Sequence, residues 1–261
     1  MNIDHDLHIH TYLSSCCLQK DRQRPSAILD LAGQMGVNTV GFADHIWANP
    51  NLPPSDWYRP QDANQTARLR ADLSSLSTSL RVLVGCEAEM IAPGKIGITP
   101  EYARKLDYVL LACSHFHMRG FVEQPASGAP KDLARHLVRF FTAAVKSGLA
   151  TAIPHPFFPC GYETQYDAAI DAIPDTEFLD VFGPAAERGV GIEVTSVFLP
   201  APPERAFALE TPVRVLSLAK QAGCRFTFGT DAHEPDTQKR LPELRPLVEA
   251  VGITAHDVLP L

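Results

Sequence analysis

Cysteine is scarce in this chain of 261 residues, which holds six, and no two of them form a C-x-x-C pair. Such a count does not indicate a disulfide scaffold, and reduced thiols in a cytoplasm are the expected state. Long apolar runs are missing too, since no stretch approaches the ~18–20 residues that a membrane helix needs. The first six residues have no basic segment followed by an apolar one, so no secretory leader is expected there.

Basic residues are in the minority, with 23 Lys+Arg against 30 Asp+Glu and a formal net charge of −7. A chain of this charge lacks the positive surface with which proteins hold nucleic acids or anionic membranes. The motifs G-x-x-x-x-G-K-[ST], G-x-G-x-x-G and G-x-S-x-G are also missing. We therefore expect no nucleic acid polymer and no membrane as a partner, and a cytoplasmic location. The sequence does not indicate an oligomeric state.

Short β-branched runs alternate with helical patterns along the whole chain. Strands are expected at 6–11, 38–44, 80–85, 107–114, 149–154, 191–195 and 225–230, and helices at 25–35, 62–76, 130–146, 175–188, 212–221 and 242–251. This alternation predicts an α/β protein with a parallel sheet wrapped by helices. About seven βα units favour a closed or nearly closed barrel over a doubly wound open sheet. Because no linker or repeat is visible, residues 1–261 are expected to form a single domain.

Histidine is plentiful, with ten residues, and most stand beside Asp, Glu or another His. His8 and His10 lie two apart in an expected strand, so they project to the same side and can chelate a metal. The ends of the other expected strands carry similar groups: Asp44 and His45, Glu87 and Glu89, His115 and His117, His155, and Asp231 and His233. Strand ends of an α/β barrel converge on one crevice, and imidazole with carboxylate suits Zn, Mn or Fe(II). The pattern predicts a site for more than one metal ion.

The motifs DLHIHT, ADH, GCEAE, SH, PHP and GTDAH, which follow in this order from residue 6 to residue 233, resemble those of the polymerase and histidinol phosphatase (PHP) superfamily of metal-dependent phosphoesterases. The resemblance implies a distorted seven-stranded (β/α)7 barrel in a single domain, with two to three divalent ions (Zn, Mn or Fe) at the strand ends. It also implies three sets of ligands: His8, His10, Glu87 and Asp231 for one ion; Glu87, His115 and His155 for a second; and His45, His233 and the residue six after His10 for a third.

That last position departs from the family pattern, which usually has His or Asp there. Here it is Cys16, whose thiolate would favour Zn or Fe(II) over Mn. The alternative is that Cys16 is a small loop residue beside a site for only two ions.

The expected reaction is hydrolysis of a small phosphomonoester, such as histidinol phosphate or a related nucleotide phosphate, by a metal-bridging hydroxide. Clustered divalent ions neutralise the charge of the phosphate and lower the pKa of bound water from 15.7 toward ~7. Glu87 would bridge the metals, and Asp231 or His233 would relay protons. Two alternatives are a metal-dependent amidohydrolase, which would place a Lys on strand four, and a non-catalytic metal-binding module, which would be expected to have lost ligands.

Substrate contacts are expected from Arg119 as a phosphate clamp, from His117 and from Thr195. Arg119 could also be a solvated loop charge. Loops 46–60 and 116–131 are expected to frame the pocket. Three further expectations concern the remaining polar side chains: Glu89 lies behind the ligands or at the surface, Asp44 orients a ligand or caps a helix, and His5, His136 and His256 are solvated. Four cysteines are interpreted as buried apolar residues: Cys86, Cys113, Cys160 and Cys224.

Overall fold

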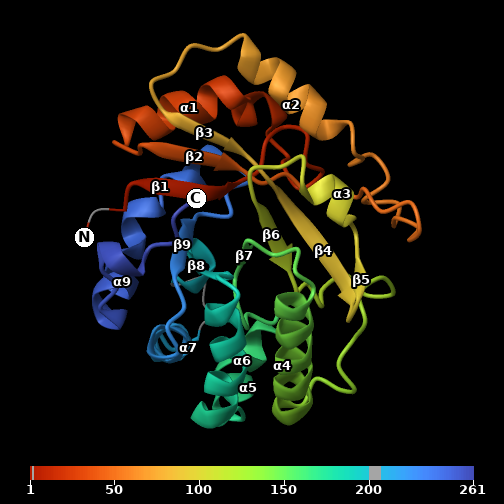
Figure 1. Ribbon diagram of the computed structural model, residues 1–261, viewed down its shortest axis with the longest axis vertical. Helices are drawn as coiled ribbons and strands as arrows, with labels where there is room; N and C mark the ends of the chain where they lie inside the picture. The colour runs from red at the N-terminus through yellow and green to blue at the C-terminus, as the bar shows by residue number, and fades with distance from the viewer. Residues whose placement is uncertain (2, 200–206) are drawn as a thin grey trace.

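In the computed structural model of the chain, which describes residues 1, 3–199 and 207–261, strands form the interior and helices lie along the outer rim (Figure 1). The strands are β1 (His5–Ile9), β2 (Thr39–Phe42), β3 (Arg81–Val84), β4 (Cys86–Ala92), β5 (Lys95–Ile96), β6 (Val109–Ala112), β7 (Ala152–Ile153), β8 (Gly191–Thr195) and β9 (Phe226–Gly229). The helices are α1 (Pro25–Gln34), α2 (Gln65–Ser74), α3 (Pro100–Ala103), α4 (Pro130–Lys146), α5 (Tyr166–Asp171), α6 (Asp175–Glu187), α7 (Glu210–Gln221), α8 (Pro235–Gln238) and α9 (Arg245–Val251).

The strands form two sheets, with the orders β1-β2-β3 and β5-β4-β6-β7-β8-β9. All neighbours are parallel except β4 and β5. The sheets meet at the isolated bridges His45↔Glu87 and Ile9↔Ala232. The mixed α/β class and the parallel pairing agree with expectation. The seven-stranded barrel is not confirmed, because the described residues form nine strands in two sheets rather than one closed barrel.

The third expected strand, 80–85, corresponds to β3 and ends at Gly85, where the chain passes from the first sheet to the second. A Cβ at Gly85 would lie 2.6 Å from the ring of Tyr108, so the ring packs directly on the backbone at this point. The chain then continues as β4, which pairs with β6 in the second sheet, whereas β3 pairs with β2 in the first. Only a residue without a side chain fits this close approach.

Side chains take part in the junction between β1 and β9. The His5 ring accepts a hydrogen bond at Nε2 from Phe228 N (3.0 Å), and Asp6 Oδ1 accepts one from Thr230 N (3.0 Å). These contacts satisfy backbone donors of the β9 segment that a regular ladder would otherwise pair. His5 is therefore buried, which corrects the expectation of a solvated residue.

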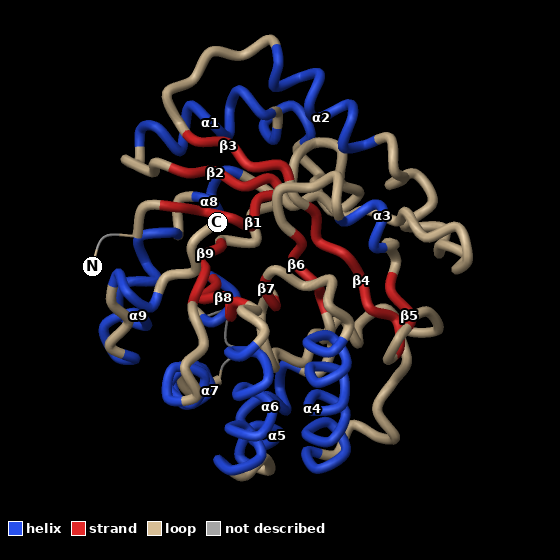
Figure 2. The backbone as a smooth tube through the Cα atoms, viewed as in Figure 1, coloured by secondary structure: helices blue, strands red, loops and turns tan. Residues whose placement is uncertain are grey.

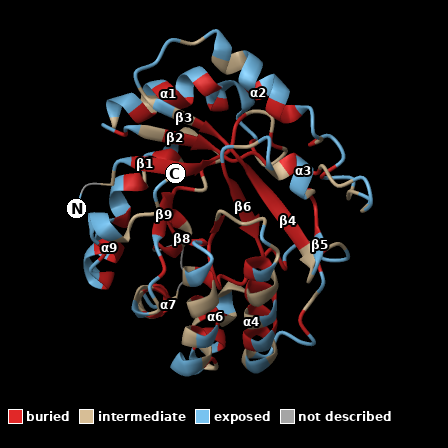
Figure 3. Cartoon of the chain, viewed as in Figure 1, coloured by how far each residue is buried: buried red, intermediate tan, exposed pale blue. Residues whose placement is uncertain are grey.

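Helix α4 illustrates how the outer layer is held. Pro130 occupies its first turn, where no backbone N–H is required, and Leu133, Leu137, Phe140 and Ala144 form a buried stripe at helical spacing. Burying each large apolar side chain contributes about 1.5–3 kcal/mol. Figure 3 shows the result, with buried strands and helices exposed on their outer faces.

His136 lies on this helix and is also buried, contrary to expectation, with Nε2 donating to the Glu123 carbonyl oxygen at 2.9 Å. His256 is exposed, as expected.

Local patterns located the longer elements well and the short ones poorly. The expected helices correspond to α1, α2, α4, α6, α7 and α9, with the start of the last one occupied by a 3-10 turn, Leu241–Leu244. The expected strand at 149–154 is only the two residues of β7, a short segment between loops in Figure 2. Among the residues that the structure describes, none of the helices combines the length and apolar character needed to cross a membrane.

Candidate metal centre

All nine predicted metal ligands come together where the strands end. His8 lies in β1 and Glu87 in β4, and the others follow the strands along the chain. They form three groups, in each of which one donor atom per residue lies within 4.8 Å of the others, and Cys160 joins the last as a tenth residue: His8, His10, Glu87 and Asp231; His10, Cys16, His45 and His233; and His115, His155 and Cys160. Parallel strands bring residues that are far apart in sequence to one edge.

Glu87 lies between these groups. Its Oε1 is 3.0 Å from His155 Nε2, and its Oε2 is 3.4 Å from His8 Nε2 and 3.3 Å from His45 Nδ1. The two-residue period of β4 explains this placement, since Cys86 and Ala88 enter the hydrophobic core while Glu87 faces the other way. One carboxylate thus presents an oxygen to each side, as a bridging ligand would.

Carboxylates stand behind two of the histidines. Glu193 Oε1 accepts from His8 Nδ1 at 2.8 Å, and Glu89 Oε2 accepts from His115 Nδ1 at 2.7 Å. A proton fixed on Nδ1 leaves the lone pair of Nε2 directed into the site. Glu89 therefore lies behind a candidate ligand and is not at the surface.

Glu193 received no role from the sequence, although an acidic residue in the middle of the apolar run 191–195 was the available signal. Asp44 accepts from Thr11 N and from the hydroxyl of Ser14, and it thereby orders the loop after β1.

Several ring nitrogens of the centre are buried without a hydrogen-bond partner among the described residues: His8 Nε2, His10 Nε2, His45 Nδ1 and His233 Nε2. A buried, unpaired nitrogen costs about 1–3 kcal/mol. Imidazole nitrogens with carboxylate oxygens are the donors that Zn and Fe(II) prefer. The residues present therefore fit divalent cations.

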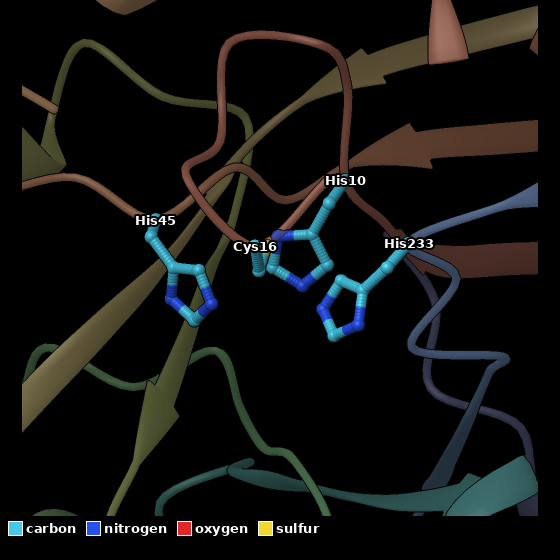
Figure 4. A group of neighbouring side chains, drawn as sticks. All are labelled: His10, Cys16, His45 and His233. Atoms are coloured by element: carbon cyan, nitrogen blue, oxygen red, sulfur yellow. The ribbon is translucent and has the colours of Figure 1, made fainter. Parts of the chain in front are cut away.

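The group that contains Cys16 is drawn in Figure 4. The ring centroid of His10 is 4.5 Å from those of both His45 and His233, and the Cys16 side chain lies between His10 and His45. A hydrogen bond with Cys17, together with burial, raises the pKa of the Cys16 thiol to about 11. The side chain points into the group, in the position that the resemblance implies for a ligand.

A cavity of about 860 Å³ opens over the centre and is lined by members of all three groups. His117 also lines it, and burial followed by the neighbouring His115 and His155 lowers the His117 pKa to about 4. Its imidazole is therefore neutral near pH 7. Both loops that were expected to frame the pocket contribute to its wall: Trp57 from loop 46–60 and Met118 from loop 116–131 line the cavity.

The two other predicted substrate contacts lie elsewhere. Arg119 is not among the described residues that line the cavity, and its guanidinium donates to the Tyr162 hydroxyl (2.7 Å) and to Gln124 Oε1 (3.1 Å). Thr195 is buried, with Oγ1 accepting from Val197 N, while its neighbour Ser196 lines the cavity.

Sequence reasoning missed Arg240, which lines the cavity and donates from Nε to Glu243 Oε2 at 3.0 Å. Its signal was a basic pair, Lys239 and Arg240, soon after the last motif.

The histidines and the carboxylates of the centre shift one another's pKa values. Burial opposes ionisation of Glu87, but His45, His8 and His115 outweigh it and hold the Glu87 pKa well below its usual value. Burial likewise opposes protonation of His115, but Glu89 and Glu87 raise its pKa to about 9. Without a cation, protons on His8, His10 and His115, whose pKa values are raised, against the effect of burial, by the neighbouring acidic groups, balance negative charge in the centre.

We expect the metal-free protein to lose stability as the pH rises from about 6.5 to above 9. The folded pKa of His115 is raised from 6.5 to about 9, so its stabilisation is complete below 6.5 and disappears as the pH passes the folded value. The loss should be on the order of 1–3 kcal/mol. Urea denaturation of chelator-treated protein across this range measures it, and the decline should be smaller in His115→Gln. Equal declines in the two proteins would contradict this assignment.

The chain matches known proteins by its three-dimensional structure, whereas comparisons of its sequence with protein families and with curated proteins find no match. The solved structure of histidinol phosphate phosphatase from Lactococcus lactis subsp. lactis Il1403, complexed with Zn, L-histidinol and phosphate, matches with a TM-score of 0.61. The match covers 97% of this chain and 95% of that one at 14% identity. At this identity the likeness shows a shared fold.

Two further matches, each at 14% identity and a TM-score of 0.49, are weaker. One is a cryo-EM structure of archaeal ribonuclease P with mature tRNA, covering 96% of this chain and 93% of that one. The other is an uncharacterized protein, covering 97% of this chain and 70% of that one. Neither supports a conclusion about this chain.

Proposed function

We propose that this chain is a metal-dependent phosphoesterase of the PHP superfamily that hydrolyses a small phosphomonoester, such as histidinol phosphate or a related nucleotide phosphate. Residues 1–261 would act as one domain, with two to three divalent ions. The observation that carries the proposal is the convergence of nine side chains, chosen from sequence motifs, into adjoining groups beneath one cavity. The fold shared with a histidinol phosphate phosphatase supports it.

The divalent ions, when bound, neutralise the phosphate charge and lower the pKa of water, which supplies the nucleophile. His8, His10, Glu87 and Asp231 would hold one ion, Glu87 with His115 and His155 a second, and Cys16, His45 and His233 a third. The oxygen of water adds to phosphorus as the bond to the leaving oxygen breaks, and one proton ends on the released alcohol.

We infer that one of two residues, Asp231 or His233, moves that proton. His233 is the more exposed, with 40% of its side chain accessible, and its Nε2 lies 3.4 Å from Asp231 Oδ1. A half-exposed imidazole beside a carboxylate can exchange protons with the cavity, which a fully buried one such as His8 cannot. Asp231 or His233 would therefore carry the proton between water and the leaving group.

The cavity also fits an organic group attached to the phosphate. Trp57, Phe158 and Phe207 give it an apolar wall, and His117 and Arg240 add polar groups. An aromatic or heterocyclic alcohol would pack on this wall while its phosphate meets the metal ligands. Arg119 as a phosphate clamp and Thr195 as a substrate contact remain predictions, and neither is among the described residues that line the cavity.

Metal analysis and a substrate screen test the proposal. Protein purified without added metal should carry two to three equivalents of Zn, Mn or Fe and should hydrolyse histidinol phosphate or p-nitrophenyl phosphate, with activity lost on chelation and restored by metal. A phosphodiester and an amide of the same leaving group serve as comparison substrates. Absence of metal, or hydrolysis of the amide alone, would reject the phosphomonoesterase. Bound metal with no turnover of any ester would indicate a binding module.

The carboxylate of Glu89 is expected to strengthen metal binding through His115. In Glu89→Gln the amide oxygen still accepts from Nδ1, but the negative charge that raises the basicity of the ring is gone. Substituting a residue that hydrogen-bonds to a metal ligand typically lowers metal affinity or activity by about 10–100-fold. Competition with a chromophoric chelator measures the affinity, with Glu249→Gln on the exposed face of α9 as control. Equal affinities would show that the charge of Glu89 does not act on the metal.

A further inference from the structure

The loop between β7 and α5 folds back over the end of β6. His155 and Phe157 adopt positive φ angles of 32° and 62°, a region that costs non-glycine residues of order 1–3 kcal/mol. The chain then reaches Cys160, whose backbone N–H donates to the Ser114 carbonyl oxygen at 3.1 Å. This contact joins the loop to the residue that precedes His115.

Gly161 brings this loop against the neighbouring chain. Its φ is 89°, and a Cβ there would lie 2.7 Å from the Cα of His117. No other residue fits that approach without displacing the backbone. The strained turn and the glycine contact together hold the side chain of Cys160 at the cavity.

The sulfur of Cys160 meets two imidazoles there. Its Sγ and a ring nitrogen of each of His115 and His155 all lie within 4.8 Å of one another, and the two Nε2 atoms are 3.2 Å apart. Glu89 holds Nδ1 of His115, and the Ser114 hydroxyl is hydrogen-bonded to Nδ1 of His155 at 3.1 Å. The two Nε2 atoms contact each other and Glu87 Oε1, so both could offer lone pairs to one cation once it displaces the protons held between them.

This separation suits a shared cation. Two nitrogens at Zn–N distances of about 2.0–2.1 Å in a tetrahedron lie roughly 3.3 Å apart. Two lone pairs facing each other at 3.2 Å repel unless a proton or a cation lies beside them. Glu87 Oε1, at 3.0 Å from His155 Nε2, supplies a further donor on the same side.

We propose that Cys160 is a metal ligand, binding as thiolate with His115, His155 and Glu87 to form a Cys-His₂-Glu site. The inference rests on the proposed function, which requires a metal at this position, and it departs from the interpretation of Cys160 as a buried apolar residue: the side chain is half-buried against the edge of the core. Cys86, Cys113 and Cys224 do lie in the core, whereas Cys160 lines the cavity. A thiolate makes the site select Zn, Fe(II) or Co over Mn and Mg.

Cobalt substitution tests this assignment directly. Chelated protein is reloaded with Co²⁺, and the thiolate-to-cobalt charge-transfer absorption in the near ultraviolet is measured together with the cobalt content. Cys160→Ser should lower this absorption, to about half if Cys16 is also a ligand, and the double variant with Cys16→Ser should lack it. Cys224→Ser, at a core cysteine between α7 and β9 that does not line the cavity, should keep it in full. Unchanged absorption in Cys160→Ser at equal cobalt content would overturn the proposal.

A second measurement uses the unmodified protein and so does not depend on how a variant folds. Iodoacetamide should alkylate Cys160 in the metal-free protein, prepared with a chelator. Reloading the protein with Zn²⁺ should protect Cys160, and mass spectrometry of the peptide that contains it measures the labelling. Equal labelling with and without bound Zn²⁺ would reject Cys160 as a ligand while leaving the phosphoesterase intact. Failure to bind Zn²⁺ or Co²⁺ at all would instead remove the proposed function, and this inference with it.

Discussion

Glu87→Gln is expected to abolish phosphomonoester hydrolysis, with a loss of about 10³-fold or more, and to release at least one metal equivalent. The reason is geometric, because its two oxygens face different sides of the centre, toward His155 and toward His8 and His45. An amide has one acceptor oxygen and no charge, so it cannot bridge two cations. Several kcal/mol of transition-state stabilisation by the metals would disappear, and each ~1.4 kcal/mol is a factor of ten in rate.

Activity assays and metal analysis on the same preparation measure this loss. Glu249→Gln, on the surface of α9, removes the same charge far from the cavity and should retain both metal and activity. If Glu87→Gln keeps its full metal content and its rate, Glu87 does not bridge ions and the mechanism proposed above is wrong.

Gly229→Ala is expected to destabilise the fold and the centre together. The added Cβ would lie 2.2 Å from Glu193 Oε1 and 2.5 Å from the Cβ of His8, both of which are buried. Overpacking of this kind costs about 1–3 kcal/mol or more. Because the methyl group displaces the carboxylate that accepts from His8 Nδ1, metal affinity should also fall by about 10–100-fold.

Thermal denaturation with and without metal, and chelator competition, measure the two effects. Gly183→Ala is the matched control, since nothing lies within 4 Å of the new Cβ and the residue is inside α6. That variant should gain about 0.5–1 kcal/mol from helix propensity. A Gly229→Ala protein as stable as wild type would show that β8 and β9 can separate to accommodate the methyl group.

The outcome for individual residues shows what local patterns can predict. Helix α4 begins and ends where the sequence predicts, because Pro130 and a run of apolar residues at helical spacing are local signals. The side chains predicted as metal ligands do lie close together, since imidazoles and carboxylates at strand ends are few and chemically distinctive. The two-residue strand β7 was overestimated, because its limits depend on pairing with β6 and β8 and not on its own residues.

Partners across the fold could not be predicted. Glu193 and His8 are 185 positions apart, and their hydrogen bond exists only because β8, β9 and β1 are neighbours. Sequence alone also could not show which of Arg119 and Arg240 lines the cavity. Both are basic residues near a motif, and the packing of Tyr162 against Arg119 keeps one away from the cavity that the other lines.

By itself, the sequence determined the α/β class and the parallel strands, and it supplied the candidate donors, because these follow from periodicity and residue type. Tertiary structure decided that the strands form two sheets, and the chain passes from one to the other at Gly85, on which Tyr108 packs. It also decided which donors share a point in space, including the approach of Cys160 to His115 and His155. Donor chemistry is a property of single residues, whereas a separation of a few ångströms is fixed by the packing of segments far apart in the chain.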